Sequence, residues 1–387
     1  MNKLLKYTLI LTLAAGIGSC TDRFTEMNTN PTEPTEVQAD LLFPNMLKAP
    51  YRGWAYQTGH NLFSNHFSNY VANSAPYFNS DRYIIPDGWS MPNWRFYFLN
   101  VLPNALQIQE QYAGDERNQN KVQQAMIWKV HQAQFMTDHY GDMPYSNAGE
   151  MEFDLDYDTQ EDIYYSFFNE LTEASNNLSE SSDQYSFGSA DLLYDGDPVK
   201  WKKFANSLRL RYAIRIANVD PAKAKAEAEA ALADGIFESN EDNAALFCDL
   251  QRGHQMRNIA NWNEFRMSKT FYDLFHNLSE IVDPRMYAYW IPARGTGEYS
   301  GIENGVPTGE LGNANEIHSN VGPFISKDRE YMIMSYAEVC FLKAEAALRG
   351  WSGFGTAKEN YEAGIKASFA YIHDQLANHT SDESLNR

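Results

Sequence analysis

The sequence predicts an all-α fold, a scaffold of helical hairpins with long irregular insertions that form a ligand-binding face. Three observations lead to this prediction. Long segments with apolar residues at i, i+3 and i+4 occur in consecutive pairs. Proline or glycine residues mark the turn within two of these pairs. Two stretches outside the pairs, 51–104 and 241–330, are rich in Gly, Pro, Asn, Tyr and Trp, and long irregular stretches in a folded domain are usually functional.

The helical pairs supply the predicted scaffold. They are 122–140 with 160–178, 199–218 with 221–234, and 331–349 with 356–376. One apolar stripe along 199–218 consists of Trp201, Phe204, Leu208, Tyr212 and Ile216. Asp220 and Pro221 then provide a capping residue and a first-turn proline for the next helix. The pairs start near 122, 199 and 331 rather than every 34 residues, so the scaffold is not a regular solenoid.

The third pair has the features of a tetratricopeptide hairpin. Small residues recur on one face of its first helix, at Ala337, Cys340, Ala344 and Ala347, and let a second helix approach closely. Glycines in "RGWSGFG" then end that helix. We therefore expect tetratricopeptide-like hairpins in an α–α superhelix. The apolar pattern also predicts that Cys340 is a buried free thiol, although pairing with Cys248 stays open.

The N-terminus predicts a lipoprotein. Lys3 and Lys6 precede an apolar run that is about half as long as a membrane span needs, which is typical of a secretory signal. The segment "IGS" before Cys20 has the pattern of a bacterial lipobox, in which the cysteine is acylated. We therefore assign residues 1–19 to the signal peptide, 20–40 to a lipidated flexible tether, and 41–387 to one helical domain.

Charge and composition exclude some classes of partner. Removal of the signal takes away two of the 31 basic residues and leaves 29 against 51 acidic ones, a net charge of −22. Such a surface repels nucleic acid and anionic lipid, so neither is an expected ligand. Aromatic residues make up 14% of the chain, more than a core of this size requires. Part of that surplus is expected to face solvent as a binding surface.

Catalytic and metal-binding signatures are largely missing, so we expect no cofactor, no metal and no enzyme. His131 and His139 lie eight residues apart without a ligand pattern, and we interpret them as satisfied polar residues on a helix. The run "DLDYDTQED" lacks the central glycine of a calcium loop, so we interpret it as a turn in which Asp158 or Thr159 caps the next helix. Paired carboxylates of a glycoside hydrolase are not visible in a sequence, and that alternative predicts turnover by the purified protein.

Aromatic and polar residues interleave in two segments of the insertions, 69–97 and 287–304. The C–H face of a sugar stacks on a flat ring while amides and carboxylates bind its hydroxyls. The candidate ligand-binding residues are Tyr77, Asn79, Asp81, Tyr83, Trp89, Trp290 and Tyr299. For Trp89 the sequence favours neither core nor surface. Trp94 has helical spacing with Phe98 and Leu102 and is expected in the core.

Several motifs together resemble the SusD/RagB family of outer-membrane nutrient-binding lipoproteins, closest to the SusD-like branch. They are "MNTNPTEP" at 27–34, "FMTDHYGDMPYSNA" at 135–148, "YDTQEDIY" at 157–164, "YDGDPVKWKKFANSLRLRYAIRIAN" at 194–218, "DPRMYAYW" at 283–290 and "MSYAEVCFLKAEAALRGW" at 334–351. The resemblance covers essentially the whole chain after Cys20. It implies a non-catalytic protein on the cell surface, held in the outer membrane by acyl chains on Cys20.

The resemblance further implies that the protein captures glycans and delivers them to a SusC-like TonB-dependent transporter. Two alternatives remain, an oligopeptide-binding lipoprotein of the same kind and a scaffold that binds only protein. The scaffold alternative predicts that the aromatic residues of the insertions are buried or disordered. Members of the family continue well past 356–376, so the resemblance also implies that a chain ending at Arg387 is a truncated form.

Overall fold

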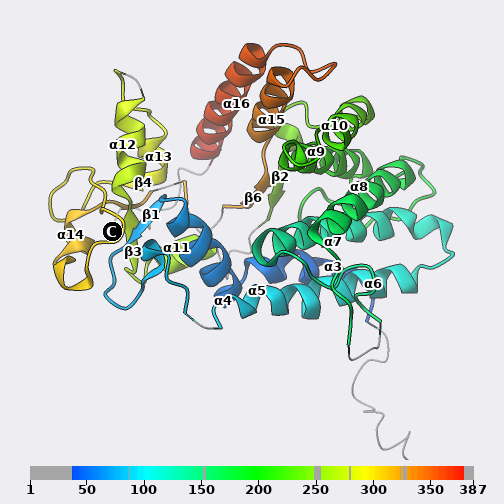
Figure 1. The fold of residues 1–387 in the computed structure, drawn as a ribbon, viewed down its shortest axis with the longest axis horizontal. Coiled ribbons are helices and arrows are strands. Elements are labelled where there is room, and N and C mark those ends of the chain that lie inside the picture. The colour runs from blue at the N-terminus through cyan, green and yellow to red at the C-terminus, as the bar shows by residue number, and fades with distance from the viewer. Residues whose placement is uncertain are drawn as a thin grey trace, which may run out of the picture. The chain divides into compact units, whose positions relative to one another are not determined.

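Helices dominate the structure, a computed structural model, which confirms the predicted fold class (Figure 1). The model describes residues 37–86, 88–150, 154–247, 254–278, 280–322, 324–325 and 329–378. Cys20, Cys248, the predicted signal and nearly all of the predicted tether lie outside these residues. The first described helix, α3, begins at Ala39, two residues before the predicted start of the domain. No helix within the described ranges is long and apolar enough to cross a membrane.

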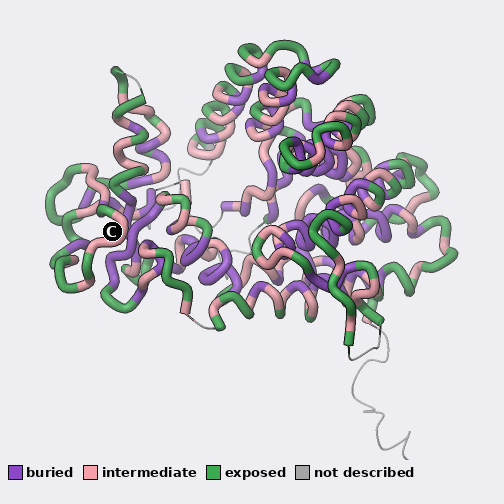
Figure 2. Tube along the Cα trace, in the orientation of Figure 1, coloured by how far each residue is buried: buried purple, intermediate pink, exposed green. Residues whose placement is uncertain are grey.

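The three predicted hairpins are all present (Figure 1). α7 (Gln119–Tyr140) packs on α8 (Gln160–Asn177), α9 (Pro198–Ile216) on α10 (Pro221–Asp234), and α15 (Tyr336–Leu348) on α16 (Ala357–Asn378). α9 also contacts α8 and α15, so it links the three hairpins. The predicted stripe along α9, from Trp201 to Ile216, is buried, as Figure 2 shows for much of α7 and α9. Cys340 is buried and free, as predicted.

Side-chain caps begin the scaffold helices. Thr159 caps α8, and Asp220 accepts a hydrogen bond from the Lys223 amide to cap α10, whose first residue is Pro221. The structure corrects the predicted start of the third hairpin. Its first helix does not begin at 331, because residues 331–334 pair with another strand and Ser335 then caps the helix.

The sequence analysis missed a further helical contact. α3 (Ala39–Lys48) and α6 (Leu102–Gln111) pack on each other, and α6 packs on α7. The Trp128 indole on α7 donates to the Met46 carbonyl at 2.9 Å and ties α3 to the first hairpin. Insertion 51–104 therefore lies almost entirely between two scaffold helices, and insertion 241–330 lies between α10 and β6.

Short elements fill the insertions. The first holds η1 (Ala49–Tyr51), α4 (Gly53–Ala55), the π-helical η2 (Tyr56–Asn65), β1 (Val71–Asn73), η3 (Ser80–Arg82), α5 (Met91–Phe96) and η4 (Tyr97–Val101). The second holds β2 (Ala244–Leu246), α11 (Gln255–Ala260), β3 (Phe265–Met267), α12 (Lys269–Asn277), α13 (Met286–Tyr289), β4 (Trp290–Ile291), η8 (Thr308–Glu310), α14 (Ala314–Ile317) and β5 (Asn320–Val321). The remaining elements are η5 (Glu116–Asn118), η6 (Gly188–Ala190), η7 (Asn240–Asp242) and β6 (Tyr331–Met334). Within the described ranges the strands form antiparallel pairs, β1 with β3, β2 with β6 and β4 with β5.

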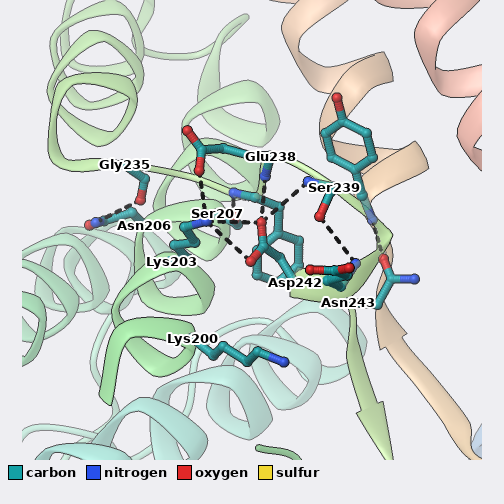
Figure 3. A network of polar contacts seen from close by, with 12 residues as sticks. Lys200, Lys203, Asn206, Ser207, Gly235, Glu238, Ser239, Asp242 and Asn243 are labelled. Carbon is teal, nitrogen blue, oxygen red and sulfur yellow. Dashed lines mark hydrogen bonds and ion pairs between the residues drawn. The ribbon is translucent and has the colours of Figure 1, made fainter. Parts of the chain in front are cut away.

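A buried carboxylate joins the second hairpin to the third (Figure 3). Asp242 is 6% exposed and accepts hydrogen bonds from the backbone amides of Glu238 and Ser239 at 2.7 and 3.3 Å. Lys203 on α9 lies 3.1 Å from the same carboxylate. The next residue, Asn243, accepts a hydrogen bond from the first amide of α15 at 2.6 Å. The loop after α10 thus holds α9 on one side and α15 on the other.

We predict that Asp242→Ala destabilises the domain by about 1–3 kcal/mol, because it leaves two backbone amides without their acceptor and leaves Lys203 with Glu238 as its one remaining ion-pair partner. Equilibrium urea unfolding of residues 20–387 measures the change. Glu241→Ala is the control, since Glu241 is exposed in the same short helix and its loss should change stability by less than about 0.5 kcal/mol. Equal effects of the two substitutions would contradict the role given to Asp242.

A second carboxylate makes stability depend on pH. Asp158 accepts hydrogen bonds from the amides of Tyr145 and Ser146, each at 2.8 Å, and from the Ser146 hydroxyl at 2.7 Å. Burial alone raises the pKa of Asp158, but these hydrogen bonds outweigh it and hold the pKa below its usual value. A carboxyl whose pKa is lowered on folding stabilises the protein above its unfolded pKa, about 4, and loses that contribution as the pH falls through the folded pKa.

We therefore predict that Asp158→Asn lowers stability near pH 7 by roughly 1–3 kcal/mol. The difference from the unsubstituted chain should shrink as the pH falls below about 4. Urea unfolding at several pH values measures it, and Asp156→Asn, an exposed neighbour, is the control. A difference that grows on acidification would show that the carboxylate does not act in this way.

Candidate functional site

The pairing of β1 with β3 brings the two insertions together. Val71 lies opposite Met267, and the Ser74 amide donates to the Glu264 carbonyl at 3.0 Å just beyond the strands. On the other side of β1, the side-chain amide of Asn304 donates to the Val71 carbonyl at 2.9 Å. Gly301 lets the chain before Asn304 pass close to the end of β3, because a Cβ there would clash with the carbonyl of Ser268. The segments that carry the predicted ligand residues thus share one region of the molecule.

Next to this pairing, four aromatic residues and one glutamate form a row in which each side chain contacts the next. We call them the aromatic strip: Trp54, Trp89, Phe78, Tyr77 and Glu264. Successive ring centroids are 5.9, 5.5 and 4.8 Å apart, and the ring planes are inclined by 63° to 85°. The Tyr77 hydroxyl donates to Glu264 at 2.9 Å. Edge-to-face contacts of this kind hold the rings rigidly in place.

Exposure differs along the aromatic strip. Trp54 and Tyr77 are 48% and 63% exposed, and Trp89 is half-buried. Phe78 is buried with Leu62 and anchors the strip in the core, where Trp89 packs against both. The strip therefore presents solvent-facing rings on a buried base, and Trp89 belongs to both environments.

Glu264 lies at the end of the strip, and hydrogen bonds hold its carboxylate, a hydrogen-bond acceptor, in a fixed position. Its second carboxylate oxygen accepts a hydrogen bond from Gln57 at 3.2 Å, and Asn61 in turn donates to Gln57 at 3.1 Å. Burial raises the pKa of Glu264, and the hydrogen bonds from Tyr77 and Gln57 partly oppose that rise. Burial and donation to Glu264 raise the pKa of Tyr77.

The element η2 and its neighbour α5 set the geometry of the strip. Thr58 donates to the Trp54 carbonyl at 2.9 Å and fixes the start of the helix that carries Gln57 and Asn61. Gly59 lets α5 approach, because a Cβ there would meet the Asn93 side chain at 2.4 Å. The chain between β1 and α5, which carries Trp89, is thereby held against η2.

Three of the predicted residues form part of a separate region of the same insertion. Tyr83 is 62% exposed, has a left-handed φ of 59° and packs against Phe67 at 5.2 Å. With Asp81 it lines a polar pocket of about 310 Å³, to which Lys269 also contributes. Asp81 itself is buried and accepts hydrogen bonds from the backbone and side chain of Asn73. Asn79 is half-buried and accepts a hydrogen bond from Arg82 at 2.9 Å.

The remaining two predicted residues do not join the strip. Trp290 is only 3% exposed, because β4 pairs with β5 and its ring packs on Phe271 at 6.1 Å. It lines an apolar pocket of about 430 Å³ and offers no open face on the surface. Tyr299 is half-buried and packs against Tyr287 at 5.3 Å. Trp290 and Asp81 are thus buried but line pockets, and their role in ligand binding stays a prediction.

Sequence reasoning missed Trp54, Gln57 and Glu264. Trp54 lies in the aromatic-rich insertion but precedes the segment that seemed most suited to sugars. Gln57 and Glu264 belong to no motif, and only the fold places them 3.2 Å apart although they are 207 residues apart in sequence. In the part of the chain that the structure describes, no group of three or more His, Cys, Asp or Glu side chains could hold a metal ion.

We predict that Tyr77→Phe raises the pKa of Glu264 further. The hydrogen bond from Tyr77 stabilises the ionised carboxylate, and the substitution removes it. Carboxyl ¹³C NMR during a pH titration measures the shift. Tyr83→Phe is the control, since Tyr83 is equally exposed and packs against Phe67 instead. An unchanged or lower pKa of Glu264 in Tyr77→Phe would contradict the geometry described here.

Comparison with known proteins agrees with the resemblance found in the sequence. A chitin-binding protein is 31% identical, with a TM-score of 0.78 over 87% of this chain and 76% of its own. A chitin-binding SusD homolog from Flavobacterium johnsoniae is 32% identical, with a TM-score of 0.79 over 87% of this chain and 71% of its own. A SusD homolog from Bacteroides vulgatus is 29% identical, with a TM-score of 0.78 over 86% and 70% of the two chains.

A search of curated proteins found no match. The family model described as "SusD-like: Susd and RagB outer membrane lipoprotein" matches residues 25–382. Because the match spans nearly the whole sequence, the chain belongs to the SusD-like family of outer-membrane lipoproteins.

Proposed function

We propose that this protein captures glycans at the cell surface through the aromatic strip and does not itself cleave them. The single observation that supports this most is the strip itself, solvent-facing rings beside a fixed carboxylate. Rings stack on the C–H faces of sugars, and Glu264 accepts hydrogen bonds from their hydroxyls. Two of the similar structures are chitin-binding proteins, which makes chitin the first glycan to test.

Exposure favours glycan binding over a scaffold that binds only protein. The scaffold alternative expects buried aromatic residues in the insertions, whereas Trp54, Tyr77 and Tyr83 are 48–63% exposed. One sugar face of ~50 Å² on a ring contributes about 1.2 kcal/mol, so two or three rings give only weak binding. Acyl chains on Cys20 compensate by holding the protein near a SusC-like transporter, to which it delivers the glycan.

The test uses residues 20–387 in native gels cast with soluble chitin derivatives, starch or xylan, followed by titration of any glycan that retards the protein. We predict that Trp54→Ala weakens the affinity by about 5- to 10-fold, as expected for one lost ring. Tyr361→Ala is the control, because Tyr361 is a 57% exposed ring on the scaffold helix α16.

Retardation that Trp54→Ala leaves unchanged would move the site away from the strip. No retardation by any glycan, together with heat from peptide pools in calorimetry, would favour the oligopeptide alternative. Release of reducing sugar by the purified protein would contradict a purely binding role.

A further inference from the structure

A second cavity lies away from the aromatic strip, where insertion and scaffold meet. It has a volume of about 510 Å³ and is lined by three histidines from separate parts of the chain. His60 comes from η2, His131 from α7, and His254 directly precedes α11. We call it the histidine cavity. Its volume lies within the range of small-molecule sites in proteins.

The three imidazoles are neutral near pH 7. Burial lowers the pKa of His60 to about 4 and the pKa values of His131 and His254 to about 3. Electrostatic repulsion of the protonated form adds to the effect, from His139 at His60, from Arg211 at His131 and from His60 at His254. A neutral imidazole has one donor and one acceptor, which matches a hydroxyl group.

Two described residues of the wall, Arg211 and Glu330, carry charge, and both are hydrogen-bonded within the protein. Arg211 makes a bidentate ion pair with Glu338, with N–O distances of 2.6 and 2.7 Å. Glu330 accepts hydrogen bonds from Tyr371 and Gln375 at 3.2 and 3.4 Å. Among the described wall residues, the one Arg or Lys side chain is thus already paired, so the wall offers an anionic ligand no free cation.

Flat rings make up much of the remaining wall. The ring centroids of Tyr51 and Tyr56 lie 5.3 and 5.1 Å from that of His60, and the ring centroid of Tyr331 lies 4.0 Å from that of His254. Contrary to the sequence interpretation of a satisfied residue, His131 is 7% exposed and its Nδ1 has no hydrogen-bond partner among the described residues. The His131 ring nevertheless lines the cavity, so the scaffold side of the wall includes an imidazole.

We propose that the histidine cavity binds one or two sugar units, as a site separate from the aromatic strip. Imidazoles and phenol rings supply donors, acceptors and flat faces, and Glu330 supplies a further acceptor for a hydroxyl group, which together match a small neutral polyol. The inference rests on the proposed function only for the class of ligand. The strip would hold an extended chain, and the cavity a short end or a free mono- or disaccharide.

The test titrates residues 20–387 with N,N′-diacetylchitobiose, cellobiose and maltose and follows the imidazole signals by ¹H–¹³C NMR. We predict that one of these disaccharides shifts the signals of His60, His131 and His254. Ser64→Trp should weaken that binding at least 10-fold, because Ser64 is exposed and lines the cavity, so a large side chain narrows it. Ser68→Trp is the matched control, an exposed serine one turn later that does not line the cavity.

A second variant tests the chemistry rather than the space. His60→Phe keeps a ring but removes both imidazole nitrogens, and it should weaken disaccharide binding at least 5-fold while gel retardation by polysaccharide is unchanged. If no disaccharide shifts the imidazoles, or if Ser64→Trp binds as tightly as Ser68→Trp, the inference is overturned. If gel retardation by polysaccharide is retained in that case, the proposed function still stands. If Trp54→Ala weakens gel retardation and His60→Phe does not, while His60→Phe weakens disaccharide binding, the two sites are separate.

Discussion

The candidate site depends on one short pairing, that of β1 with β3. Each strand has three residues, and they join parts of the chain about 190 residues apart. Two short strands alone are marginally stable, so side chains must support them. Ser74 donates to the Asn263 carbonyl at 3.2 Å, and Asn304 donates to the Val71 carbonyl on the other side. Glu264 directly precedes β3 and Tyr77 lies four residues after β1, so the pairing brings the two residues together.

The sequence could predict the scaffold because its helices carry their own periodic signal. The stripe from Trp201 to Ile216 and the caps Thr159 and Asp220 are local features, and the structure confirms them. Local signals also explain the misses. Strands of three or four residues are too short to show alternation, so Tyr331–Met334 was assigned to the following helix. α3 contains Pro44, which weakens a helical pattern although the helix continues through it.

The site could be predicted only in part, because burial of an aromatic residue in the insertions is decided by distant segments. Trp290 and Trp54 both lie in insertions that are rich in aromatic residues. In the structure Trp290 is 3% exposed, in the strand β4 that pairs with β5, whereas Trp54 is 48% exposed. The sequence points to Tyr77 and Trp89 because aromatic residues cluster near them, and their binding of a ligand stays a prediction. It does not point to Glu264 and Gln57, since their place in the strip comes from a contact across 207 residues.

The element η2 serves the strip and the cavity at once. Gln57 is fully buried and holds Glu264 of the aromatic strip, while His60, three residues later, lines the histidine cavity. Internal hydrogen bonds stiffen the segment, from Asn61 to Gln57 and from Ser64 to the Gly59 carbonyl at 2.9 Å. A helix held this tightly moves as a unit, so a displacement of η2 by a ligand in the cavity would also displace Gln57 and with it the acceptor end of the strip. The aromatic strip and the histidine cavity therefore share one helix, which carries the Gln57 that holds Glu264 and the His60 that lines the cavity.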